Sequence, residues 1–260
     1  MQQENDIILN CRDLVVSFGG VNALNGVDFS VSRGSIAAII GPNGAGKTTL
    51  LNVVSGLVQA NKGDVEFSGQ LITSWPAHRR GRAGVVRTFQ NLEIFSNMSV
   101  TENVMTGCHS HVHYSVVDAL LKTPRYWKGE KLFREYGERE LEFVGLLDQK
   151  EVPAGELPFG SQRLLELARA VSSQPELLLL DEPAAGLNIR ETGNLGRLIR
   201  RIRDERGITI VLVEHDMDLV MRISDMVTVL NFGDVIARDK PLAIQKDAQV
   251  IAAYLGDNGD

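Results

Sequence analysis

Four short runs of apolar residues along the chain predict buried β-strands. They cover residues 36–40, 177–180, 208–213 and 226–230. A strand that is covered on both faces is apolar along its whole length, which is typical of parallel sheets with helices packed on each side. These runs therefore predict a parallel sheet within an α/β fold.

A different pattern in the first third of the chain predicts antiparallel strands. Residues 27–31 alternate apolar and polar side chains, as a strand with one solvated face does. A polar stretch separates residues 6–10 from residues 14–18, so we expect two strands there. The segments of this layer and the tight turns between them are residues 6–10, 14–18, 27–31, 64–67 and 70–72, with turns at Gly19-Gly20 and Ser68-Gly69.

Apolar positions at helical spacing predict helices between residues 99 and 174, most clearly over residues 131–144 and 162–173. The end of the chain, residues 241–255, predicts one short helix. Its expected buried face carries Ile244, Val250, Ile251 and Tyr254.

These patterns predict a single domain over residues 6–258. Its core comprises residues 6–90 and 175–240, with a helical subdomain inserted at about 91–174 and a C-terminal helix over 241–258. The predicted fold class is α/β, with a parallel-sheet core, an N-terminal antiparallel β layer and a helical insertion.

Residues 41–48 match G-x-x-x-x-G-K-S/T, the loop that binds nucleotide phosphates. Its glycines allow the backbone to approach a ligand, and successive N–H groups then form an anion-binding nest. Lys47 can reach the β- and γ-phosphates, and the Thr48 hydroxyl can bind Mg²⁺. A predicted strand precedes the loop and a helical pattern follows it, which is the context that the motif requires. The predicted nucleotide-binding residues are Gly41, Pro42, Asn43, Gly44, Ala45, Gly46, Lys47, Thr48 and Thr49.

Two carboxylates, Asp181 and Glu182, follow one of the apolar runs directly. The carboxyl end of a parallel strand is where an α/β sheet binds its ligand. We expect Asp181 to orient the Mg²⁺ shell and Glu182 to act as the base that polarises the attacking water. The alternative is a strand followed by a solvated Asp-Glu-Pro turn, and the phosphate-binding loop favours the functional interpretation.

Three further residues carry weaker signals. His215 follows residues 208–213 and can hydrogen-bond a γ-phosphate if that strand neighbours residues 36–40; a packed or capping histidine is the alternative. Gln90 can approach Mg²⁺ and the water, or lie in an exposed loop. Phe18 either stacks on adenine, a contact of about 1–3 kcal/mol, or closes the core at a strand end.

Composition narrows the choice of function mainly by exclusion. The chain has 260 residues and a net charge of −6, which argues against a nucleic-acid clamp. No apolar run approaches the roughly 18 residues of a membrane span. The polar N-terminus is no secretory signal, and Cys11 and Cys108 form no disulfide framework. We therefore expect a cytoplasmic protein that reaches a membrane only through a partner.

Residues 157–170 complete a set of motifs that resembles the ATP-binding-cassette (ABC) ATPases across nearly the whole chain. They stand where that family carries its signature, ahead of the acidic strand. The resemblance implies ATP hydrolysis with Mg²⁺ by two cassettes that close head to tail, each signature helix facing the other cassette's phosphate loop. Gly160 would permit close approach of the helix N-terminus to the γ-phosphate. The implied signature contacts are Phe159, Gly160, Ser161 and Gln162.

Four further segments look like one subgroup, the first ATPase subunit of branched-chain amino acid importers and of relatives that move urea or short amides. They are residues 19–24, 87–91, 181–188 and 253–257. The resemblance implies a second ATPase subunit, two membrane-spanning permease subunits, a solute-binding protein and a place on the cytoplasmic side of the inner membrane. It also implies that Tyr126, Trp127 and Phe133 lie near the surface that receives a permease helix.

Three residues depart from the general family pattern. Pro158 and Ser161 stand where the signature has Ser and Gln, and Asn188 replaces the usual Asp of the loop at the dimer interface. Because the signature acts on the partner's site, these changes imply an asymmetric heterodimer with one competent and one weaker site.

Other interpretations stay open. His109, His111 and His113 would share one face of a strand and could bind zinc or nickel, but would scatter on a helix. A cluster of arginines is either a solvated helix face or a nucleic-acid contact. The alternative function is that of a non-transport ABC ATPase that acts on ribosomes or nucleic acid. The arginines concerned are Arg197, Arg200, Arg201 and Arg203.

Overall fold

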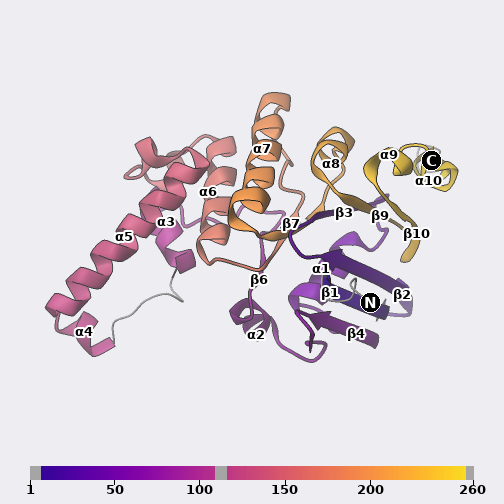
Figure 1. Cartoon of the computed structure of the whole chain (residues 1–260), viewed down its shortest axis with the longest axis horizontal. Coiled ribbons are helices and arrows are strands. Elements are labelled where there is room, and N and C mark those ends of the chain that lie inside the picture. The colour runs from indigo at the N-terminus through magenta and orange to yellow at the C-terminus, as the bar shows by residue number, and fades with distance from the viewer. Residues whose placement is uncertain (1–6, 109–115, 256–260) are drawn as a thin grey trace. The chain divides into compact units, whose positions relative to one another are not determined.

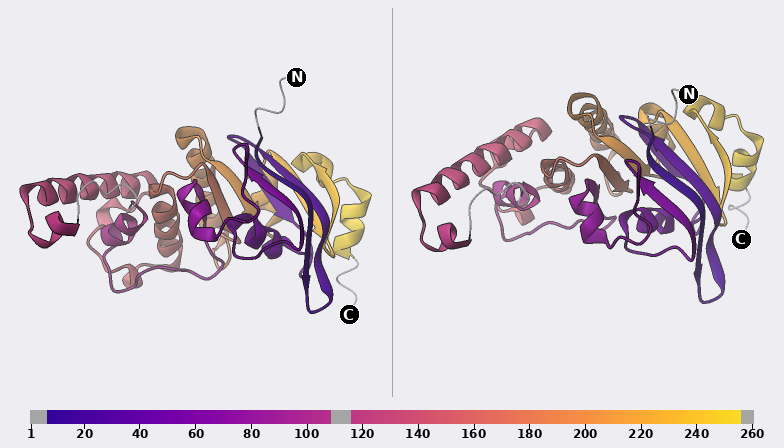
Figure 2. Two further views of the ribbon diagram at one scale, coloured as in Figure 1. Left: turned by 90° about the horizontal axis from the view of Figure 1, so that it is seen from below. Right: turned by 60° about the horizontal axis from the view of Figure 1, so that its bottom comes forward.

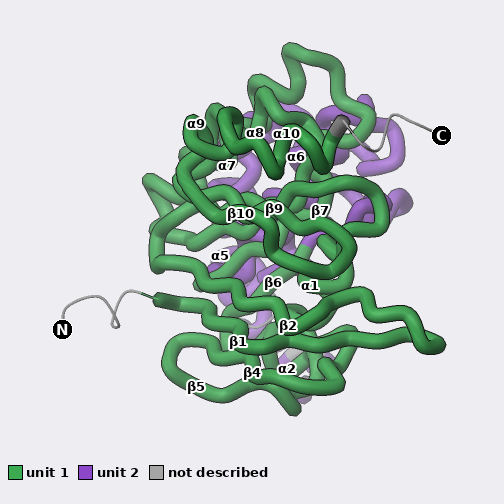
Figure 3. Tube along the Cα trace, turned by 90° about the vertical axis from the view of Figure 1, so that its right-hand side faces the viewer, with its two compact units in different colours: residues 1–87, 176–260 green, residues 88–175 purple. Residues whose placement is uncertain are grey.

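The computed structural model describes residues 7–108 and 116–255 (Figure 1). The chain divides into two compact units, coloured separately in Figure 3: residues 1–87 with 176–260, and residues 88–175. Within the described ranges, no helix combines the length and apolar character needed to cross a bilayer.

A six-stranded sheet with the order β10-β9-β3-β8-β7-β6 organises the first unit. The four strands predicted as parallel are β3, β7, β8 and β9, and they pair in parallel as expected. The structure adds a short parallel strand, β6, at one edge and an antiparallel strand, β10, at the other. Their bounds are Ile36–Ile40 (β3), Val85–Arg87 (β6), Leu177–Asp181 (β7), Thr209–Val213 (β8), Met226–Asn231 (β9) and Asp234–Asp239 (β10).

The antiparallel sheet has the order β2-β1-β4-β5. Its strands are Ile7–Phe18 (β1), Val21–Ser32 (β2), Lys62–Phe67 (β4) and Gln70–Leu71 (β5). Both predicted two-residue turns are present, with positive φ angles at Gly19, Gly20, Ser68 and Gly69.

The prediction of two strands before Gly19 is wrong, because β1 runs without interruption through the polar stretch. The pairing register of β1 with β2 shifts between Cys11 and Leu14. Asp13 has a φ of 49°, and its N–H donates to the Asp28 carboxylate at 2.9 Å. An irregularity of this kind absorbs extra polar residues without ending a strand.

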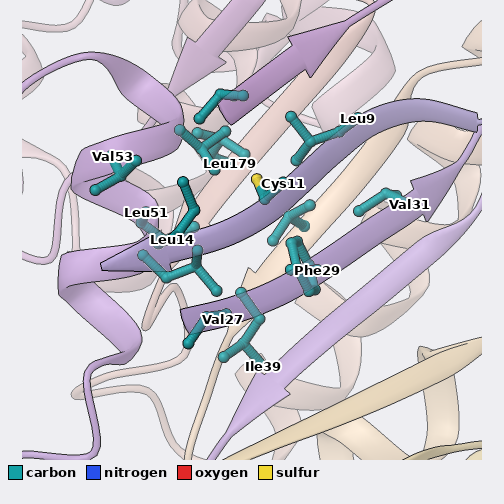
Figure 4. Packing of buried hydrophobic residues seen from close by; sticks show 14 of the residues in the cluster. Leu9, Cys11, Leu14, Val27, Phe29, Val31, Ile39, Leu51, Val53 and Leu179 are labelled. Carbon is teal, nitrogen blue, oxygen red and sulfur yellow. The ribbon is translucent and has the colours of Figure 1, made fainter. Parts of the chain in front are cut away.

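Helix α1 (Lys47–Ser55) packs in the layer between the two sheets. Figure 4 shows side chains of β1 and β2 meeting Ile39 of β3, Leu179 of β7 and Leu51 of α1 in one apolar cluster. Cys11 belongs to this cluster, and burial raises the pKa of its thiol to about 12, so it packs as an uncharged apolar side chain.

The opposite face of the six-stranded sheet is covered by α8 (Met217–Ile223), α9 (Pro241–Ile244) and α10 (Ala248–Leu255). Successive side chains of β3 point to opposite faces of the sheet. Ile39 therefore packs in the cluster on the first face and Ile40 in the cluster on the second. In Figure 2 the indigo strands β1 and β2 and the yellow helices α9 and α10 accordingly lie on opposite sides of β9 and β10.

The single C-terminal helix that the sequence predicted is two helices. Asp247 separates them, and its carboxylate accepts hydrogen bonds from the N–H groups of Gln249 and Val250 at 2.8 and 3.1 Å, which starts α10. Ile244 and Val250 are buried as expected, whereas Ile251 is 45% exposed and lies off the predicted face.

The second unit is helical. Its main helices are α3 (Val100–Gly107), α4 (Val116–Leu120), α5 (Pro124–Val144) and α6 (Phe159–Ser172), with 3₁₀ turns at Leu147–Gln149 (η3) and Ala154–Glu156 (η4). Helix α5 begins seven residues before the predicted position, because Thr123 caps it and Pro124 occupies its first turn. Gly107 allows α3 to touch α6, since a Cβ there would lie 2.2 Å from the carbonyl oxygen of Arg169.

Arg80, in α2 (Ala77–Arg82), fixes the C-terminal end of α1. Its guanidinium donates to the carbonyl oxygens of Val53 and Val54 at 2.6 and 2.9 Å, and also to those of Trp75 and Thr73. Arg80 is 1% exposed, and burial lowers its pKa. Its charge is therefore offset by the carbonyl oxygens at the negative end of a helix.

Replacing Arg80 with Met should lower the free energy of unfolding by about 3 kcal/mol, because the buried carbonyl oxygens lose their donors. The neighbouring Arg79→Met variant is a matched control: Arg79 is exposed and stacks on Trp75 at 3.8 Å, a contact worth about 0.5–1 kcal/mol. Urea unfolding of both variants measures the difference. Equal losses would contradict a special role for Arg80.

Candidate functional site

The glycine-rich loop connects β3 to α1 and comes very close to neighbouring backbone. Gly41 has a φ of 148°, and a Cβ there would lie 2.0 Å from the carbonyl oxygen of Leu230. Gly46 has a φ of 102°, and its Cβ would lie 2.5 Å from the carbonyl oxygen of Ala23. Any side chain at either position would therefore move the loop away from the sheet.

The loop lines an open cavity of about 200 Å³. Seven of the nine predicted loop residues line it, and Glu182 lines it from the end of β7. The lining residues are Ala23, Asn43, Gly44, Ala45, Gly46, Lys47, Thr48, Thr49 and Glu182. The structure thus brings the loop and the second carboxylate of the acidic strand to one concave site.

Lys47 is buried at the start of α1, and its ammonium group lies within the loop. Its Nζ donates to the carbonyl oxygens of Gly41 and Pro42 at 2.7 and 2.8 Å. These neutral acceptors hold the positive charge at the wall of the cavity, where a phosphate oxygen would be a stronger acceptor.

Asp181 lies at the carboxyl end of β7 and is 3% exposed. Its Oδ2 accepts from Arg87 Nη2 at 2.8 Å in a buried ion pair. Its Oδ1 is also buried and has no hydrogen-bond donor among the described residues. An orphaned buried carboxylate oxygen is costly unless a ligand satisfies it, so this atom fits the water shell of a bound cation.

Glu182 adopts a left-handed backbone conformation with a φ of 48°. Its N–H donates to the carbonyl oxygen of Val213 at 2.9 Å. His215 Nδ1 lies 3.7 Å from Glu182 Oε2, and the His215 side chain is 66% exposed. Strand β8 does neighbour β3, as the prediction for His215 required.

Phe18 is 52% exposed and ends β1 opposite Val21. Its exposure argues against the alternative that it closes the core. Stacking on adenine stays a prediction.

Gln90 and the signature residues belong to the second unit. Arg163 of α6 donates from Nη2 to the carbonyl oxygen of Gln90 at 2.7 Å and pairs with Glu166. Phe159, Gly160, Ser161 and Gln162 form the first turn of α6. Their contacts with a nucleotide or with a second cassette stay predictions.

The metal interpretation of His109, His111 and His113 falls outside the described residues. Over residues 7–108 and 116–255, no cluster of three or more His, Cys, Asp or Glu side chains could hold a metal ion by itself.

Sequence analysis missed the part that Arg87 plays. Besides Asp181, its guanidinium donates to Asn52 Oδ1 at 2.6 Å and to Ser55 Oγ at 3.2 Å, both on α1. A basic residue at the end of a strand that neighbours an acidic strand end was the available signal. Arg87 therefore joins the acidic strand to the helix that follows the loop.

Replacing Arg87 with Met should lower the free energy of unfolding by about 3–5 kcal/mol, because the buried Asp181 carboxylate loses its cation. Arg33→Met is the matched control, since Arg33 pairs with Glu176 at 2.8 Å where both side chains are about half exposed; such a pair is worth about 0–1 kcal/mol. Denaturant titration of both variants compares the two pairs. A loss of under about 1 kcal/mol for Arg87→Met would contradict this assignment.

Two sequence profiles of known protein families match this chain. The profile of the ABC transporter family matches residues 24–185. A second profile, described as branched-chain amino acid ATP-binding cassette transporter, matches residues 235–260.

Two relatives are similar over almost their whole length. The high-affinity branched-chain amino acid transport ATP-binding protein BraF of Pseudomonas aeruginosa is 43% identical over 250 residues, covering 96% of this chain and 98% of the relative. LivG of Escherichia coli, with the same description, is 40% identical with the same coverage. Among solved structures, the ADP conformation of MJ1267, an ATP-binding cassette of an ABC transporter, has a TM-score of 0.83, 32% identity and coverage of 96% and 99%. This chain belongs to the ATP-binding cassettes of the ABC transporter family.

Proposed function

We propose that this chain is the ATP-hydrolysing subunit of an importer for branched-chain amino acids or a related small polar solute. The observation that carries the proposal is the cavity shared by the glycine-rich loop and Glu182. It is supported by relatives that are similar to 96% of this chain and are named as branched-chain amino acid transport ATP-binding proteins. Those relatives favour a transporter over the alternative of an ATPase that acts on ribosomes or nucleic acid.

ATP would bind with its phosphates in the loop cavity. The backbone N–H groups around Gly44 and Gly46 and the N-terminus of α1 supply partial positive charge. Lys47 would exchange its two carbonyl acceptors for β- and γ-phosphate oxygens, which are charged and therefore stronger partners. Phe18, half exposed at its strand end, is placed in this proposal under the adenine ring.

Mg²⁺ fits the oxygen donors of this chain. Thr48 would contribute its hydroxyl, and Asp181 Oδ1 would accept a hydrogen bond from the ion's water shell. The side-chain carbonyl of Gln90 stays a ligand predicted from the sequence. The ion, when bound, neutralises charge on the phosphates. Arg87 donates to the other oxygen of Asp181, Oδ2, which leaves Oδ1 available to that water shell.

Hydrolysis needs a base beside the γ-phosphate. Glu182 lines the cavity and is 21% exposed, so its carboxylate can accept a proton from an attacking water. His215, 3.7 Å from that carboxylate, would donate a hydrogen bond to the γ-phosphate. This pair would complete the site within the chain.

The proposed partners are a second ATPase subunit, two membrane-spanning permease subunits and a solute-binding protein, with this chain on the cytoplasmic side of the inner membrane. In that assembly Phe159, Gly160, Ser161 and Gln162 would face the partner's nucleotide. Pro158 and Ser161 would weaken that site, giving a heterodimer with unequal sites. Trp127, which is 58% exposed and packs edge-on against Tyr126, supports a permease contact near Tyr126, Trp127 and Phe133.

The Glu182→Gln variant should bind ATP normally but hydrolyse it about 10²–10⁴-fold more slowly, because Gln cannot accept the proton of the water. Single-turnover hydrolysis in the complex with its partner subunits measures the rate, and calorimetry measures binding. Normal turnover in this variant would remove Glu182 from the role of base.

The Lys47→Ala variant should instead weaken ATP binding itself, by about 10-fold or more, since charge-assisted hydrogen bonds to phosphate are lost. Titration calorimetry with Mg-ATP tests this directly. Lys62→Ala is the control, because Lys62 is an exposed lysine of β4 that pairs with Asp13. Unchanged affinity in Lys47→Ala would contradict the assignment of the loop.

A further inference from the structure

Glu214 is a buried carboxylate for which neither the motifs nor the proposed reaction has a use. It stands between the end of β8 and His215, and it is 1% exposed. Burial raises the pKa of this carboxyl, while hydrogen bonds from backbone N–H groups, led by that of Ala184, and the nearby His215 oppose the rise. A buried carboxyl group is retained at a cost, so its contacts need a reason.

The contacts of Glu214 connect two different loops. Its Oε1 accepts from the N–H of Ala184 at 2.8 Å. Its Oε2 accepts from the N–H groups of His215 and Asp216 at 3.1 and 3.3 Å. One oxygen therefore holds the loop after β7, and the other holds the loop after β8.

Each of these loops carries one residue of the proposed catalytic pair. Ala184 lies two positions after Glu182, and His215 follows Glu214 directly. The Glu182 N–H donates to the Val213 carbonyl oxygen at 2.9 Å, and the Ala185 N–H donates to the Glu182 carbonyl oxygen at 3.1 Å. Because Glu182 has a left-handed backbone, which is unfavourable for a residue with a side chain, its conformation needs support from both sides.

We propose that Glu214 is a positioning residue that sets the separation of Glu182 and His215 by fastening their two loops to one carboxylate. The inference rests on the proposed function, since it assumes that these two residues act on ATP. Glu214 itself lies inside the protein and acts through the backbone of its neighbours, without contacting the nucleotide.

The Glu214→Gln variant tests the proposal with little change of shape. Its amide NH₂ group has to face one of the two loops, where it meets N–H donors instead of accepting from them. We expect kcat for ATP hydrolysis in the complex with its partner subunits to fall about 10²-fold, as for a displacement of catalytic groups by about 1 Å. The affinity for Mg-ATP should stay within about twofold, because the phosphate loop is not altered.

Two further variants complete the test. Glu214→Asp keeps the charge but is too short to reach both loops, so it should also lower kcat and serves if Glu214→Gln does not fold. Glu176→Gln, at an exposed glutamate before β7 that pairs with Arg33, is the control with the same chemical change and should leave kcat and affinity unchanged. Urea unfolding shows whether each variant is folded at the assay temperature.

A double-mutant cycle with His215→Ala separates positioning from a general structural role. If Glu214 acts through the catalytic pair, Glu214→Gln should cost much less in the His215→Ala background than in the natural chain. Full additivity, equal losses in kcat and affinity, or a kcat within about twofold of the natural chain for both Glu214 variants would overturn the proposal. If Glu182→Gln and His215→Ala themselves leave hydrolysis unchanged, the proposed function fails instead.

Discussion

The register of three parallel strands, β7, β8 and β3, is the constraint on which the rest of the site depends. Asp181 pairs with Val213, and Val213 pairs with Ile39, so the three strands end on one line. Glu182, Glu214 and the glycine-rich loop each follow directly after one of these strand ends. A slip of one residue in any strand would turn its side chains to the other face and separate these groups.

Helix α1 shows how the same constraint fixes the orientation of the phosphate loop. Lys47 at its start is held by loop carbonyl oxygens, Arg87 binds Asn52 and Ser55 on its side, and Arg80 binds the carbonyl oxygens of its last turn. Three buried cations, each with named oxygen partners, thus anchor one helix of nine residues. Since a buried charge is strongly destabilising when a partner is lost, the axis of α1 and its positive end have little freedom to move.

The sequence predicted the parts of this fold whose signals are local. The apolar runs identified β3, β7, β8 and β9. The glycine loop was recognised because its residue spacing alone places the backbone N–H groups, Lys47 and Thr48 around a phosphate. The structure differed at two aspartates. Asp13 continues β1 through a polar stretch, where its N–H donates to the Asp28 carboxylate on β2. Asp247 splits the C-terminal helix through a local cap, since its carboxylate accepts from the first N–H groups of α10. The roles of Arg87 and Glu214 were missed, because their partners Asp181 and Ala184 lie 94 and 30 residues away.

The helices differ in whether a side chain caps the N–H groups of their first turn. Helices α3, α5, α7 (Ile189–Arg206) and α8 have an N-cap side chain that accepts from the first turn. The N-cap residues of α1 and α6, Gly46 and Pro158, provide no such acceptor, and neither do those of the short helices α2 and α9. The first N–H groups of a helix need a partner, and an anion is a favourable one. In the proposed assembly, α1 would meet the triphosphate of its own chain and α6 that of the second cassette. Gly46 lines the loop cavity, so the open end of α1 lies where a phosphate of ATP would supply the missing acceptor.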